Sequence, residues 1–253
     1  MSRVRAGASL SSAEPLRALR EYVRLSELPL TCLIFVVPLM IAYELGMAHY
    51  THGRVQQIPP IIAFDWMRRF FVFFGATGRY LPAMAVGAIL ITWHIARKDP
   101  WSVDVPTVVG MIAESILLGL PLLVLGNLVH RYMPLFPGSV EWRSNTVMCI
   151  GAGVYEELVF RLILFTLLHI LFIDAFEIPK AWGSLLIVVS SAVLFSLYHY
   201  LGAEAFSWET FTFRTLAGAY FGLIFLTRGF GVTVGSHAAY DVTVVLLITS
   251  SIR

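Results

Sequence analysis

The sequence predicts an all-α protein, a polytopic bundle of about seven to eight transmembrane helices with a polar cleft among the C-terminal helices. Hydrophobic residues make up 58% of the 253 residues, and charged residues only 13%. That charged share is about half of what soluble domains carry. Several apolar runs reach about 20 residues, the length that crosses a bilayer. The ionisable residues inside these runs gather in the C-terminal half of the chain.

The composition also excludes several classes of protein. A formal net charge of +2 gives no basic face for nucleic acid. The apolar content excludes a disordered tail and an ordinary cytosolic enzyme. Cys32 and Cys149 each lie in an apolar run, which argues against a disulfide framework and against a zinc site built on thiolates.

The first expected span runs from about Leu28 to Ala48. Because its apolar stretch is too long for a signal-peptide core and no small-residue cleavage site follows, we expect a retained helix. By the positive-inside rule, an arginine-rich flank before the first span favours a cytoplasmic N-terminus. The arginines of this flank are Arg3, Arg5, Arg17, Arg20 and Arg24.

The stretch 61–75 carries Asp65, Arg68 and Arg69 in its middle, so we expect an interfacial or re-entrant helix there rather than a span. Further spans are expected at 80–96, 105–129, 145–172, 181–200, 210–227 and 231–250. We divide the chain into an N-terminal arm with peripheral membrane helices, 1–140, and a core that carries the chemistry, 141–253.

Ionised side chains at bilayer depth are costly, so those found there tend to be paired or functional. In the stretch 151–165, Glu157 and Arg161 are four residues apart and share a helix face. This spacing predicts a structural ion pair between them. Glu156 points about 100° away from Glu157 on a helix and is left to face another helix, as a general base or acid would.

Two further helices carry polar pairs at the same spacing. Phe195 and His199 are four residues apart, and so are His237 and Asp241. Taken alone, His199 fits an interfacial histidine, and His237 with Asp241 fits a local pair that satisfies itself. The three helices together predict a buried polar site with one carboxylate base and two imidazoles.

Two other glutamates lie in apolar segments. Glu44 is near a helix end, where an interfacial position is expected, and Glu114 is expected to face the bundle or to pair with an arginine. The glycine pairs Gly218 with Gly222 and Gly231 with Gly235 have the spacing that allows helices to pack closely.

The segments EELVFR (156–161), FSLYH (195–199) and HAAYD (237–241) occur in this order. They resemble the motifs of the CPBP family, the CAAX-protease and bacteriocin-processing type of intramembrane protease, which is related to the type II CAAX prenyl endopeptidases. The family pattern is Glu-Glu-x-x-x-Arg, then Phe-x-x-x-His, then His-x-x-x-Asn, with a related polar residue in place of Asn in some members. The resemblance covers about 145–250, whereas the first 140 residues carry no family signature.

The resemblance implies glutamate-dependent hydrolysis of a peptide bond within the membrane. It implies that Glu156 and His199 activate a water, and that His237 and residue 241 bind the oxyanion. It further implies that Glu157, Arg161 and Phe195 support the site. Asp241 stands where the best-known members have Asn. It either stays protonated and donates a hydrogen bond, or, as we favour, orients His237 as a carboxylate partner.

The implied partners are a membrane-associated peptide or protein substrate and the lipid bilayer, without nucleic acid. No cofactor is expected, although Glu156, His199, His237 and Asp241 are chemically adequate for a zinc-dependent version of the protease. The same side chains are also compatible with a non-catalytic scaffold or immunity protein of this fold, and with a transporter that uses them as a proton relay. We expect a multi-pass protein of a bacterial plasma membrane.

Overall fold

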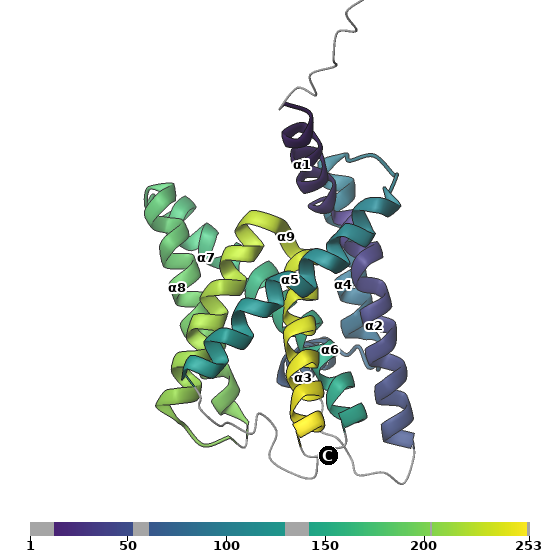
Figure 1. The fold of residues 1–253 in the computed structure, drawn as a ribbon, viewed down its shortest axis with the longest axis vertical. Helices are drawn as coiled ribbons and strands as arrows, with labels where there is room; N and C mark the ends of the chain where they lie inside the picture. The colour runs from purple at the N-terminus through teal and green to yellow at the C-terminus, as the bar shows by residue number, and fades with distance from the viewer. Residues whose placement is uncertain (1–12, 53–60, 130–141, 203, 252–253) are drawn as a thin grey trace, which may run out of the picture.

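The computed structural model describes residues 13–52, 61–129, 142–202 and 204–251, and every regular element in these ranges is helical (Figure 1). This confirms the predicted all-α bundle. The elements are α1 (Ala13–Ser26), α2 (Pro29–His52), α3 (Ile62–Phe73), α4 (Leu81–Arg97), α5 (Val105–Val129), α6 (Trp142–Glu157), the π-helix η1 (Leu158–Leu164), α7 (Phe165–His169), the π-helix η2 (Ile170–Ala175), α8 (Lys180–Tyr198), the 3₁₀ helix η3 (His199–Leu201) and α9 (Trp208–Ser251). The expected boundary between 140 and 141 lies outside the described residues.

Five helices among the described residues are long and apolar enough to cross a membrane. The expectation of seven spans differs from this result for two reasons. The helix predicted at 80–96 is α4, which has only 17 residues. The spans predicted at 210–227 and 231–250 both lie in α9. The five are Pro29–Tyr50, Val105–Val129, Trp142–Ala175, Lys180–Leu201 and Trp208–Thr249.

Helix α9 is bent sharply at Gly229, where φ is 75° and ψ is −176°. This backbone conformation is essentially restricted to glycine. The two arms on either side of Gly229 fold back on each other (Figure 1). Two contacts between the arms show this: Phe213 contacts Tyr240, and Phe221 stacks on His237. The two predicted passes therefore correspond to two antiparallel arms of one bent helix, which we call the first arm (208–228) and the second arm (230–251).

The stretch predicted to be interfacial or re-entrant forms α3, a helix of 12 residues that packs on α4 and α6. Asp65 forms ion pairs with Arg68 and Arg69, whose side chains are 50% and 76% exposed. The hydrogen bond from Arg68, followed by that from Arg69, lowers the pKa of Asp65. The one acidic side chain in this stretch is thus paired with both arginines, and a net charge of +1 remains on an exposed helix face.

Helix α9 lies at the centre of the bundle and packs most extensively on α5, α6 and α8. Its contact with α6 is especially close at Gly153, where a Cβ atom would lie 2.8 Å from the backbone nitrogen of Ala238. Gly153 is one helical turn before Glu157, so this close approach brings Glu157 to the second arm of α9. The predicted close packing at the glycine pairs is also confirmed, since side chains there would collide with neighbouring helices at Gly231 and Gly235.

The two glutamates outside the three motifs have partners. Glu114 pairs with Arg228, with 2.8 Å between its Oε2 and the arginine Nη2, as one of the two expectations had it. Glu44, which was expected to be interfacial, is buried within the bundle. Its Oε1 accepts a hydrogen bond of 3.1 Å from the Tyr155 hydroxyl, which gives the carboxylate a partner inside the bundle.

Candidate active site

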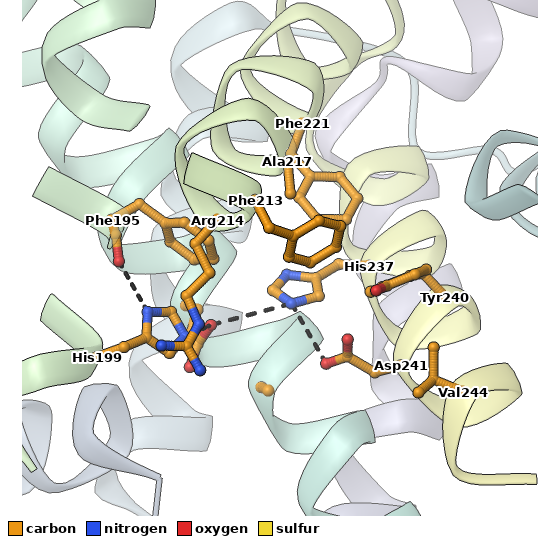
Figure 2. A pocket seen from close by; sticks show the side chains of 12 residues that line it. Phe195, His199, Phe213, Arg214, Ala217, Phe221, His237, Tyr240, Asp241 and Val244 are labelled. Atoms are coloured by element: carbon orange, nitrogen blue, oxygen red, sulfur yellow. Dashed lines mark hydrogen bonds and ion pairs between the residues drawn. The ribbon is translucent and has the colours of Figure 1, made fainter. Parts of the chain in front are cut away.

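The three motifs meet at one pocket between α6, α8 and both arms of α9 (Figure 2). The pocket has a volume of about 180 Å³ and is partly open to the exterior. The residues that line it are Ala152, Glu156, Phe195, His199, Phe213, Arg214, Ala217, Phe221, His237, Tyr240, Asp241 and Val244.

Glu156 is the side chain on which both imidazoles converge. Its Oε2 lies 3.8 Å from His199 Nε2 and 3.9 Å from His237 Nε2. These separations exceed a direct hydrogen bond, and polar atoms at such distances are commonly bridged by a water molecule. The side chain of Glu156 is only 8% exposed, so most of the bulk solvent is excluded from this carboxylate.

The ring of His199 is oriented by its own helix. Its Nδ1 lies 2.8 Å from the carbonyl oxygen of Phe195, one turn earlier in α8. Since a carbonyl oxygen can only accept, Nδ1 carries the hydrogen and donates it. The other ring nitrogen, Nε2, is thereby directed toward Glu156 and the pocket.

The ring of His237 is held by Glu157, whose Oε1 lies 2.7 Å from Nδ1. Asp241 Oδ2 lies 3.4 Å from the opposite nitrogen, Nε2, on the pocket side. The ring is fixed further by stacking on Phe221, with 4.6 Å between ring centroids. His237 therefore lies between two carboxylates: the predicted contact with Asp241 is present at Nε2, and Glu157 adds a hydrogen bond at Nδ1 that the sequence did not predict.

Arg161 is completely buried and forms the predicted ion pair with Glu157, with 3.1 Å between its Nε and the carboxylate Oε2. Its Nη2 donates a hydrogen bond of 3.0 Å to the carbonyl oxygen of Gly218 in the first arm of α9. The guanidinium carbon lies 4.7 Å from the ring centre of Phe195 and 5.7 Å from that of Phe221. Arg161 thus connects all three helices of the site.

The backbone of α6 changes at this point. The helix continues as the π-helix η1, which begins directly after Glu157 and contains Arg161. Single π turns within α-helices are frequent at functional sites, because the additional residue changes the direction of the side chains that follow.

Sequence reasoning did not assign Tyr198, Phe221 or Gly218 to the site, although it named Gly218 as a position of close helix packing. The Tyr198 hydroxyl accepts a hydrogen bond of 2.6 Å from the backbone N–H of Ala63 and donates one of 3.4 Å to Glu156 Oε1. Ala63 lies in the first turn of α3, where N–H groups have no partner within the helix. Tyr198 could have been noticed in the sequence, since it directly precedes His199 in the FSLYH segment.

Within the part of the chain that the structure describes, no three His, Cys, Asp or Glu side chains form a group that could hold a metal ion. Glu156, His199, His237 and Asp241 nevertheless lie around one pocket, with the separations given above.

Residues 139–243 match the family model described as type II CAAX prenyl endopeptidase Rce1-like. The matched stretch includes all of the residues that line the pocket except Val244. The match supports membership of the CAAX protease family, as the three motifs had predicted. No curated protein and no solved structure gives a match to this chain.

Proposed function

We propose that this member of the CAAX protease family is an intramembrane endopeptidase in which Glu156 activates a water molecule. The convergence of two imidazole nitrogens on one buried carboxylate is the observation that carries the proposal. The substrate is a peptide bond in a membrane-associated peptide or protein.

In the proposed reaction, a water molecule lies between Glu156 and His199. Glu156 accepts a proton while the water oxygen attacks the scissile carbonyl carbon, and a tetrahedral intermediate forms. The proton is then passed to the leaving amine as the C–N bond breaks. His199 supports this transfer because its Nε2 faces Glu156 while its Nδ1 is occupied by the Phe195 carbonyl.

His237 is proposed to stabilise the oxyanion as an imidazolium, in which Nδ1–H donates to Glu157 and Nε2–H donates to the oxyanion. The bond from Nδ1 to Glu157 fixes the ring so that Nε2 points into the pocket. A fixed donor of this kind typically contributes about 3–4 kcal/mol to transition-state stabilisation. Glu157 and Arg161 are positioning residues in this scheme, and Asp241 lies next to Nε2 on the side where substrate would enter.

Replacing the proposed base tests the function. Glu156→Gln retains the size of the side chain and is expected to lower kcat by about 10²–10⁴-fold without loss of folding. The matched control is Glu209→Gln, since Glu209 is exposed in the first turn of α9. Cleavage of a panel of membrane-anchored peptides is measured for wild type and both variants at equal membrane levels, with and without a strong zinc chelator.

Cleavage that needs Glu156 and is unaffected by the chelator supports the glutamate mechanism. Cleavage abolished by the chelator in the wild type supports the metal-dependent version instead. If the Glu156→Gln protein preserves the cellular phenotype of wild type, the catalytic proposal is wrong and a scaffold or immunity function replaces it.

A further inference from the structure

Arg214 is a cation in the same pocket as the proposed catalytic side chains, and it has no part in the reaction described above. Among the described residues that line the pocket, it is the one Lys or Arg. The other ionisable groups there are two carboxylates, two imidazoles and one phenol. Because a guanidinium stays charged at any physiological pH, Arg214 supplies a permanent positive charge to this pocket.

The contacts of Arg214 match the binding of a carboxylate. Its two terminal nitrogens, Nη1 and Nη2, donate to the two oxygens of Glu204, at 2.8 Å each. This parallel pair of hydrogen bonds is the geometry in which arginine recognises planar carboxylates. The guanidinium is therefore already aligned for a carboxylate, and Glu204 supplies one.

The two partners differ in how firmly they are held. Arg214 lies on the first arm of α9, its side chain is 18% exposed, and its guanidinium lies 5.7 Å from the ring centre of Tyr200. Glu204 lies in the irregular segment before α9, and its side chain is 39% exposed. A substrate carboxylate that displaces Glu204 offers the arginine the same two hydrogen bonds, so the exchange replaces one bidentate pair with another while the arginine stays in place.

We propose that Arg214 determines specificity by binding a carboxylate of the substrate in place of Glu204; this inference rests on the proposed endopeptidase function. Arg214 and His199 line the same pocket, and in the view of Figure 2 both lie on the side away from Asp241. A carboxylate bound there avoids the charge of Asp241 and lies next to the side chains proposed to cleave the peptide bond. The substrate therefore carries its negative charge close to the scissile bond.

Such a carboxylate has two sources, the free C-terminus of the substrate or an acidic side chain near the cleavage site. The experiment uses a peptide that the wild type cleaves, in three forms. One has a free C-terminal carboxylate, one has a C-terminal amide, and one has each Asp and Glu near the cleavage site replaced by the corresponding amide residue. The form whose KM rises relative to the unmodified peptide identifies the source of the carboxylate.

Wild type is expected to show a KM about 10- to 100-fold lower for the form that retains the relevant carboxylate, in line with one charge-assisted hydrogen-bonded pair. Arg214→Gln erases this discrimination through KM rather than kcat, and Arg214→Lys restores part of it. Glu204→Gln has the opposite effect to Arg214→Gln: it lowers KM for the carboxylate form, because the arginine is no longer occupied.

Opposite changes in KM for the Arg214→Gln and Glu204→Gln variants would exclude a merely structural function of this ion pair. If the pair only fastened the segment before α9, Glu204→Gln and Arg214→Gln would change activity in the same direction, and the inference would be overturned. Equal KM values of wild type for all three forms would also overturn it, while leaving the endopeptidase function intact. Failure of the proposed function is a separate result, in which wild type and Glu156→Gln give the same cleavage.

Discussion

Arg161 is a fully buried charged side chain, and it contacts every helix that forms the site. Its charge is met by Glu157, and its remaining contacts are the Gly218 carbonyl and two aromatic rings. A buried charge without its partner is far more costly than an apolar side chain of similar size. Glu157 is itself shared between Arg161 and His237, so the structural pair and the proposed oxyanion donor depend on one carboxylate.

We therefore predict that Glu157→Leu lowers the free energy of unfolding by about 3–5 kcal/mol, because it leaves Arg161 buried and unpaired. The double variant Glu157→Leu with Arg161→Leu is expected to recover most of this stability. It is also expected to remain nearly inactive, because His237 Nδ1 has lost its acceptor. Thermal unfolding in detergent and peptide cleavage are measured on the same samples. A double variant with wild-type activity would show that Glu157 does not position His237.

At the scale of the helices, the bend of α9 assembles the pocket from both sides. The first arm contributes Arg214 and Phe221, and the second arm contributes His237 and Asp241. Both arms can face one pocket only because the chain reverses at Gly229. The bend is held from outside by Arg228, which pairs with Glu114 of α5 and donates to Ser26 of α1.

Gly229→Ala is expected to destabilise the protein by about 1–3 kcal/mol, since a side chain is strained at this positive φ. Cleavage activity is expected to fall by more than the loss of folded protein accounts for, because the two arms would no longer be held in the relative position that forms the pocket. Gly87→Ala is the matched control: this glycine lies in α4, and a Cβ there meets nothing within 4 Å. Cleavage and thermal unfolding distinguish the variants, and equal behaviour of the two would contradict a special requirement at the bend.

At the scale of the whole molecule, the bundle has two distinct ends. Helix α1 lies at one end and the last turns of α9 at the other (Figure 1). The bend of α9 lies near α1, since Arg228 contacts Ser26, so both arms of α9 run from there toward the opposite end. If the N-terminal arm is cytoplasmic, as the arginine flank predicts, then the start of α9 lies on the other side of the membrane.

Cysteine labelling tests this arrangement. Cys32 and Cys149 are buried, so reagents in water are expected to leave them unmodified. Leu16→Cys on α1 and Trp208→Cys at the start of α9 each replace an exposed side chain. A membrane-impermeant maleimide is expected to label the first from the cytoplasmic side and the second from the opposite side. Labelling of both from one side would contradict this topology, and reversed labelling would place the N-terminus outside.

The helical bundle and the convergence of its three motifs on one site could be predicted from the sequence. Apolar runs of membrane-spanning length favour helices strongly, because the backbone must satisfy its own hydrogen bonds in lipid. Polar residues four apart in such helices share a face, so the pairing of Glu157 with Arg161 followed directly from their spacing.

Only the tertiary structure showed which carboxylates contact each of the two histidines. The spacing of four residues predicted the contact between His237 and Asp241, but not that Glu157 holds the opposite ring nitrogen. The close contact at Gly153 brings α6 against α9 and places Glu157 behind the ring, a contact that the spacing along a single helix cannot reveal. The bend at Gly229, the cap on α3 by Tyr198 and the position of Arg214 in the pocket likewise depend on contacts between segments far apart in the chain.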